Sequence, residues 1–312
     1  MAEFVPANVP PVGEIRGPGM DHAHYPFRGL PDAPRFAWPD NARIAFTVTL
    51  VLDYWELDAP GDGYPDPRIV SPLGKFFPDW LTWSHRQYGA RVGIFRILDV
   101  LDRFGVKPSV ALGTEAAKRY PELVDALLRR DACFMAHGDY ASRRITSRMD
   151  GEAGFIASAR DGIADATGQT PAGWCGQDFN QSAETPALLA AAGFQYTTDW
   201  ANDDRPFMLG PYPAGSLLAL PPQPEWNDLE CMWLRRVTPP VWSANIGDAF
   251  DVLRAEGSPE GGTVFNLTLH PWLTGQGHRI RYLREALHRI MGQSGVWLAT
   301  TDAVAEAARA QL

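Results

Sequence analysis

Short apolar runs of strand length recur along the chain and predict the strands of a buried sheet. The strongest run covers residues 43–52, which are β-branched and almost entirely apolar, as expected of a strand that is buried on both faces. Further strands are predicted at 108–112, 132–136, 173–175, 194–198, 216–220, 263–269 and 296–298. Apolar residues at helical spacing predict helices between several of them, at 92–101, 122–130, 151–167 and 186–192.

The repeated alternation of helix and strand indicates an α/β fold with a parallel sheet, and its repetition through the whole chain favours a barrel over an open sheet. A length of 312 residues suits one barrel domain of roughly 250 residues with insertions. Residues 1–40 are rich in Pro and Gly and show no periodicity. They are therefore predicted to form an N-terminal arm, followed by a single barrel domain over residues 41–312.

The composition and charge of the chain argue against two classes of binding partner. The formal charge of -9 and a pI near 5.3 argue against nucleic acid and anionic membranes, which both require a basic face. No stretch approaches the roughly 18 apolar residues of a membrane span, and the first residues lack the pattern of a secretory signal. With three unpatterned cysteines and no disulfide framework, a cytoplasmic protein is expected.

Four ionisable side chains follow or close predicted strands: Asp53, His137, Asp199 and His270. In a barrel, the carboxyl ends of all strands meet at one mouth, so these side chains are expected to face a common site. A carboxylate that activates water and a histidine that protonates a leaving nitrogen suit the hydrolysis of an amide. The chain has neither a phosphate-cradling glycine loop nor a Gly-x-Ser-x-Gly elbow, which disfavours nucleotide-dependent and serine-hydrolase chemistry.

The order of these motifs resembles the polysaccharide deacetylase superfamily (NodB homology, carbohydrate esterase family 4) over roughly residues 40–300. The resemblance rests on the strand ending in Asp53, on Ala136-His137-Gly138, on Pro171-Ala172-Gly173-Trp174, on Asp199-Trp200 and on Leu267-Thr268-Leu269-His270. Two further stretches, residues 88–93 (YGARVG) and 199–207 (DWANDDRPF), are closest to the branch of metal-independent allantoinases and cytoplasmic peptidoglycan-deacetylase-like proteins.

This resemblance implies a distorted (β/α) barrel of about seven strands that hydrolyses a carbon–nitrogen bond other than a peptide bond. By position, Asp53 would be the carboxylate of the first motif, acting as base or metal ligand. His137 would be the first histidine of a metal site, and His270 the acid that assists the leaving group.

The chain departs from the deacetylase pattern at two places. The superfamily's deacetylases have a second histidine four residues after the first, where this chain has Ala141, and the arginine usual in the third motif is absent, with Trp174 near its place. Asp53 and His137 alone fall short of the three protein ligands of a catalytic zinc, for which Glu56 is a candidate third. The cofactor expectation is therefore open between one divalent metal, zinc, and none.

A pocket bordered by Tyr54, Trp55, Trp174, Trp200 and Trp272 would suit a small, flat or cyclic amide, although each aromatic ring is equally well explained as core. The full set of expected substrate-binding residues is Glu56, Arg91, Trp174, Asp199, Trp200 and Trp272. The leading hypothesis is a hydrolase of a small cyclic amide or N-acyl compound, similar to allantoinase. The alternatives are an amino-sugar or peptidoglycan N-deacetylase and a catalytically inactive barrel that binds a small ligand.

The expected partners are a small-molecule substrate and further copies of the chain. Residues 221–228 and the N-terminal arm are candidate subunit contacts in a homo-oligomer, or else pack within one chain.

Overall fold

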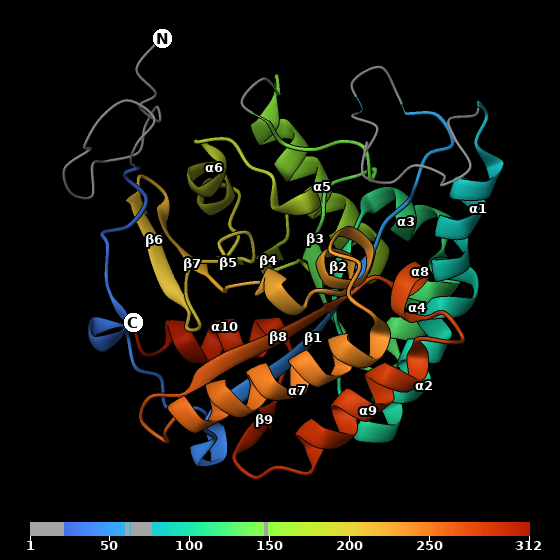
Figure 1. Ribbon diagram of the computed structural model, residues 1–312. Coiled ribbons are helices and arrows are strands. Elements are labelled where there is room, and N and C mark those ends of the chain that lie inside the picture. Colours follow the sequence, from blue (N-terminus) through green and yellow to red (C-terminus); the bar gives the residue numbers. More distant parts are fainter. Residues whose placement is uncertain (1–21, 60–62, 64–76, 147–148) are drawn as a thin grey trace.

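The computed structural model describes residues 22–59, 63, 77–146 and 149–312, which form a curled sheet surrounded by helices (Figure 1). The sheet is built from β1 (Ile44–Leu52), β2 (Ser109–Leu112), β3 (Cys133–Ala136), β4 (Gly173–Trp174), β5 (Tyr196–Thr197), β6 (Phe207–Tyr212), β7 (Gly215–Ala219), β8 (Thr263–Leu269) and β9 (Val296–Leu298). Its strand order is β6-β7-β5-β4-β3-β2-β1-β8, and β9 pairs with β1. Neighbouring strands are parallel, except for the antiparallel pair β6 and β7.

Helices follow most of the strands and cover the outer face of the sheet (Figure 1). They are α1 (Trp80–Tyr88), α2 (Ile94–Phe104), α3 (Thr114–Arg119), α4 (Pro121–Leu128), α5 (Glu152–Thr167), α6 (Thr185–Ala191), α7 (Pro239–Glu256), α8 (Pro271–Thr274), α9 (Ile280–Met291) and α10 (Thr301–Arg309). The shorter turns are η1 (Leu30–Asp32), η2 (Pro39–Asn41), η4 (Gln177–Phe179) and η5 (Pro224–Trp226), with π-helical turns at η3 (Gly89–Gly93) and η6 (Leu229–Leu234).

Alternation of side chains along the strands separates two apolar cores. In β1, Phe46, Val48 and Leu50 belong to the larger core beneath the helices, whereas Ala45 and Val51 belong to a smaller core inside the curl. Since neighbouring strands repeat this alternation in register, a residue's position in its strand decides whether its side chain points to the helices or to the barrel interior.

Side chains from the segment between β7 and α7 cover the free edge of β8. The Gln223 side chain donates to the carbonyl of Val264 at 2.6 Å and accepts from the amide of Asn266 at 2.7 Å. The indole of Trp226 donates to the carbonyl of Asn266 at 3.1 Å. These contacts satisfy an edge that would otherwise expose unpaired backbone groups. The segment predicted for subunit contacts, 221–228, thus packs within the chain at these positions.

The α/β barrel predicted from the sequence is confirmed. The predicted strands are present with shifts of at most two residues at each end, but the sheet of the described residues has nine strands rather than about seven. The antiparallel strand β6 and the helices α1, α3, α7, α8, α9 and α10 were not predicted. Of the predicted arm, residues 1–21 lie outside the described part, and residues 22–40 contain only η1 and part of η2. No helix in the described ranges has the length and apolarity to cross a membrane.

Candidate active site

Strand register brings Asp53 and His137 to one level at the carboxyl edge of the sheet. Leu52 pairs with Leu112 in β2, and Leu112 pairs with Ala136 in β3, so the next level holds Asp53, Gly113 and His137. The side chains of the two outer residues, Asp53 and His137, meet at this level. Asp53 Oδ1 lies 3.4 Å from His137 Nε2, and the two side chains are only 8% and 4% exposed.

Hydrogen bonds fix the orientation of both groups. His137 Nδ1 donates to the carbonyl of Cys175, which can only accept, so His137 turns Nε2 toward Asp53. The amide of Gln177 donates to Asp53 Oδ1 at 2.7 Å and to the carbonyl of His137 at 2.9 Å. Both groups are therefore held before any substrate arrives.

His270 follows β8 and is held by a buried carboxylate. His270 Nδ1 lies 2.7 Å from Oδ1 of Asp228, a residue with no exposed surface. The other carboxylate oxygen accepts from the backbone N–H of His270 at 2.9 Å and from the Thr274 hydroxyl at 2.6 Å. With Nδ1 engaged in this way, Nε2 is the ring nitrogen of His270 that can serve a substrate.

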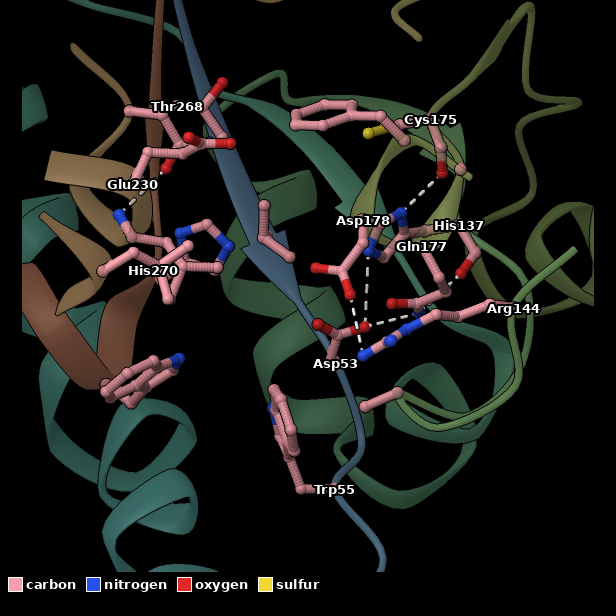
Figure 2. Close-up of a pocket in the computed structure, with 18 residues that line it drawn as sticks. Asp53, Trp55, His137, Arg144, Cys175, Gln177, Asp178, Glu230, Thr268 and His270 are labelled. Atoms are coloured by element: carbon pink, nitrogen blue, oxygen red, sulfur yellow. Dashed lines mark hydrogen bonds and ion pairs between the residues drawn. The ribbon is translucent and has the colours of Figure 1, made fainter. Parts of the chain in front are cut away.

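One cavity joins the two groups. Figure 2 shows His270 facing Asp53 and His137 across it, with Trp55 at its edge. The lining residues are Val51, Asp53, Trp55, His137, Ala141, Arg144, Cys175, Gly176, Gln177, Asp178, Phe179, Asn227, Leu229, Glu230, Leu234, Thr268, His270 and Trp272. Carboxylates, imidazoles and amides thus share the cavity with two indole rings and leucine side chains, as in a site for a small organic substrate.

A partly buried ion pair completes the wall beside Asp53. Arg144 Nη2 lies 2.7 Å from Asp178 Oδ2, and the Arg144 side chain is 10% exposed (Figure 2). Asp178 and Phe179 both have left-handed backbone, with φ of 51° and 56°. For a bulky residue such as Phe179 this conformation is unusual, and strained residues of this kind cluster at functional sites.

No family model matches the chain. A candidate polysaccharide deacetylase of Schizosaccharomyces pombe is 26% identical over 303 residues, covering 86% of this chain and 91% of that protein. Among solved structures, a candidate polysaccharide deacetylase of Mycobacterium smegmatis has a TM-score of 0.75 at 26% identity, with 89% of this chain and 94% of the other covered. PuuE allantoinase has a TM-score of 0.78 at 25% identity, with the same coverage of both chains. Over most of its length the chain is thus similar to members of the NodB-like polysaccharide deacetylase superfamily. The predicted enzyme class, a hydrolase of carbon–nitrogen bonds other than peptide bonds, is confirmed.

The superfamily's metal site can be tested against the residues of this NodB-like barrel. Asp53 and His137 face each other, and the Nδ1 of His137 is fixed by a carbonyl, as for a metal-binding histidine. At the position of the second histidine, however, Ala141 lines the cavity. The part of the chain that the structure describes contains no group of three or more His, Cys, Asp or Glu placed to hold a metal ion. These residues therefore do not fit a catalytic zinc with three protein ligands.

Two predicted site residues lie behind the cavity wall. Trp174 and Asp199 follow the outward alternation of β4 and β5, so Trp174 packs against Phe155 and Phe194 in the larger core. Asp199 accepts a hydrogen bond from the backbone N–H of Gly176 at 2.8 Å, and burial raises its pKa to about 7. Asp199 supports the cavity wall from behind and does not line it.

Of the remaining predicted site residues, some line the cavity and others lie outside it. Trp272 lines the cavity, whereas Trp200 packs against His22, His24 and Tyr25 of the arm. Glu56 accepts from the Ser142 hydroxyl at 2.5 Å, and its pKa is raised, chiefly by burial.

Arg91 is exposed on η3 and does not line the cavity, and Tyr54 lies under the guanidinium of Arg119. The structure thus brings Asp53, His137, His270, Trp55 and Trp272 together, and leaves the others of the expected set outside the cavity.

The sequence analysis missed the polar residues Asp228, Gln177, Asp178 and Arg144. One signal was present for Gln177, because it lies two residues beyond Cys175 and so continues the inward alternation that places Met135 and His137 in the barrel.

Proposed function

We propose that this NodB-like barrel hydrolyses a ring amide or related carbon–nitrogen bond of a small cyclic substrate, as allantoinases do. The observation that supports this most directly is a single cavity with two opposed groups. On one side lie Asp53 and His137, 3.4 Å apart, and on the other lies His270, held by the buried Asp228. A base and an acid on opposite sides of one bond are what amide hydrolysis requires.

In the proposed reaction, Asp53 takes a proton from a water molecule, whose oxygen attacks the carbonyl carbon and forms a tetrahedral intermediate. The carbon–nitrogen bond then breaks as His270 Nε2 gives a proton to the leaving nitrogen. Asp228 accepts from Nδ1 of the same ring at 2.7 Å and stabilises the imidazolium form that supplies this proton.

The apolar walls favour a compact, flat substrate. Trp55 and Trp272 line the cavity together with Leu229 and Leu234. Indole faces pack well against planar amide rings, and the polar groups that fix orientation are few and converge on one side.

A second candidate is removal of an acetyl group from an amino sugar. It is favoured by the relatives of Schizosaccharomyces pombe and Mycobacterium smegmatis, whose names refer to polysaccharide deacetylation and whose identity to this chain is as high as that of the allantoinase. Both reactions use the same acid and base, so the substrate distinguishes them.

The test is turnover of a panel that contains allantoin, hydantoins, cyclic imides and N-acetylated chitooligosaccharides. Ring opening of a cyclic amide with no acetate release supports the proposal, and acetate release from the oligosaccharides alone supports the deacetylase. Asp53→Asn and His270→Gln should each lower kcat by roughly 10²–10⁴-fold with unfolding curves close to that of the parent. Rates near the parent value in both variants would refute the assigned roles.

A further inference from the structure

The loop after β3 supplies a buried cation to the cavity. This loop carries Ala141 at the position of the superfamily's second histidine, and three residues later it carries Arg144. Both residues line the cavity, and the Arg144 guanidinium is ion-paired with Asp178 on the wall that holds Asp53 (Figure 2). The same loop thus has no metal-ligand side chain at position 141 and places a positive charge in the cavity.

The charges of the cavity make this cation necessary. Asp53 and Asp178 are carboxylates on one wall, both partly or wholly withdrawn from water, with side chains 8% and 22% exposed. Buried carboxylates require a compensating positive charge. Gln177 donates neutral hydrogen bonds only, and the three-ligand metal set is absent from the described residues, so the Arg144 guanidinium is the permanent cation of this wall.

The hydrogen-bond donors of this wall indicate that Arg144 also has a role in contacting the substrate. The Gln177 amide donates to Asp53 and to the carbonyl of His137, and the backbone N–H of Gly176 donates to Asp199. His137 Nδ1 donates to Cys175. The Arg144 guanidinium adds several donors in a planar, rigid fork, and Asp178 fixes the orientation of this fork.

We infer that Arg144 is a catalytic residue that takes the electrostatic part of a metal ion, contacting the substrate carbonyl oxygen and stabilising the negative charge that develops on it. Asp178 is the positioning residue that aims the guanidinium. The inference rests on the proposed function for the identity of the reacting carbonyl. The positive charge beside Asp53 and His137 does not depend on which amide is hydrolysed.

The kinetic test compares Arg144→Gln and Arg144→Lys with Arg143→Gln. Arg143 is the matched control, because it is the adjacent residue, forms a 2.7 Å ion pair with Asp139 and does not line the cavity. Arg144→Gln should lower kcat by about 10²–10³-fold with little change in KM, as for loss of a donor to a developing oxyanion, and Arg144→Lys should lose less. Added guanidinium ion should restore part of the Arg144→Gln rate and have no effect on Arg143→Gln.

Equal, small losses in Arg144→Gln and Arg143→Gln, with no rescue by guanidinium, would show that Arg144 has only a structural role. A second outcome would also contradict the inference. It is a fall in kcat of Arg144→Gln that is explained by a loss of folding free energy, together with a fully active Arg144→Lys, because a lysine cannot reproduce the fork of the guanidinium.

A second measurement does not require turnover and so separates this inference from the proposed function. Zn²⁺ is titrated into the parent protein and Arg144→Gln by calorimetry, with Arg143→Gln as control. If the guanidinium holds the place of the cation, the parent binds no stoichiometric Zn²⁺ at this site, and Arg144→Gln gains at least tenfold in Zn²⁺ affinity through Asp53 and His137. Stoichiometric Zn²⁺ on the parent that is lost in His137→Ala would overturn the inference, even if no substrate of the panel is turned over.

Discussion

At the scale of single residues, the acid side of the site depends on a carboxylate that lies 42 positions before the histidine it holds. Asp228 accepts three hydrogen bonds, from the His270 ring, the His270 backbone and Thr274, and none of its surface is exposed. A fully buried carboxylate is maintained only by such a set of donors. The same contacts fix the orientation of the His270 ring, so Asp228 contributes both to stability and to the placement of the proposed acid.

Asp228→Asn should separate these two contributions. Asparagine keeps the shape but removes the negative charge that favours the imidazolium, and kcat should fall by about 10²–10⁴-fold by analogy with the aspartate of a catalytic triad. Thr274→Val, which removes only one donor to the same carboxylate, should cost about 1 kcal/mol of unfolding free energy and change kcat little. Steady-state kinetics and urea unfolding of both variants provide the check. A fully active Asp228→Asn variant would exclude His270 as the acid.

The raised pKa of Asp199 should make the unfolding free energy of the chain depend on pH. Burial raises its pKa to about 7, above the unfolded value of 3.8, so between these values the folded chain keeps a proton that the unfolded chain has lost. Its contribution to stability is therefore complete below pH 3.8 and is lost as pH rises to 7, by on the order of 4 kcal/mol. Asp199→Asn should remove this loss, so the unfolding free energy of the variant relative to the parent should increase from pH 4.5 to pH 8. A difference that is constant with pH would mean that Asp199 titrates normally.

The placement of each site residue decides whether the sequence can predict it. Asp53, His137 and His270 stand where strands end, and strand ends are visible in the hydrophobic pattern. Gln177 reaches Asp53 across 124 positions and Asp228 reaches His270 across 42, and no local pattern marks such contacts. Trp174 and Asp199 also stand at strand ends, but their side chains follow the outward alternation, so a strand end alone does not place a side chain in the site.

At the scale of elements, the π-helical turn η3 positions the loop that carries His270. A Cβ on Gly89 would lie 2.6 Å from the backbone nitrogen of Trp272, and one on Gly93 would lie 2.1 Å from the carbonyl oxygen of Pro271. These two glycines therefore allow η3 to contact the backbone of α8 directly. The stretch 88–93 carried part of the family resemblance, and in this fold it matters through its glycines, since the predicted substrate-binding residue Arg91 is exposed.

Gly93→Ala should accordingly lower the unfolding free energy by about 3 kcal/mol and reduce turnover, because the added methyl group pushes α8 and His270 away from the cavity. Gly154→Ala is the matched control: this glycine lies in α5 with nothing within 4 Å of an added Cβ, so alanine should stabilise the chain by about 0.5–1 kcal/mol. Chemical denaturation of the two variants gives the comparison. Equal stability in both would mean that α8 can shift at no cost.

The elements themselves were predictable to different degrees. β1 and β8 are long apolar runs with β-branched residues, and both were located within one residue. β6 contains Gly210 and Pro211, which obscure the strand pattern, and it pairs antiparallel in a barrel that is otherwise parallel. It is held by β7, a partner that is adjacent in sequence, so pairing rather than intrinsic preference defines it.

At the scale of the whole molecule, the alternation of helix and strand was sufficient to predict the barrel, because parallel strands need long crossovers and buried strands need helices on the outside. How the curl is completed was not predictable. The gap beside β8 is covered by the side chains of Gln223 and Trp226 and by the carbonyl of Asp204, which accepts from Val264. The homo-oligomer, the cytoplasmic location, the absence of nucleic-acid and membrane partners and the division into arm and barrel stay predictions.

The closure beside β8 should depend on the side chain of Gln223. Gln223→Leu keeps the bulk of the side chain but leaves the buried carbonyl of Val264 and the buried amide of Asn266 without their partners, at a cost of about 3 kcal/mol. Amide hydrogen exchange at Asn266 should accelerate, and the chain should aggregate more readily through the uncovered edge of β8. Gln195→Leu, at an exposed glutamine that donates only to nearby Gly193, should change stability by less than about 0.5 kcal/mol. If the two variants unfold at the same urea concentration and Asn266 stays protected, backbone contacts alone close the barrel, and the side chain of Gln223 adds nothing to it.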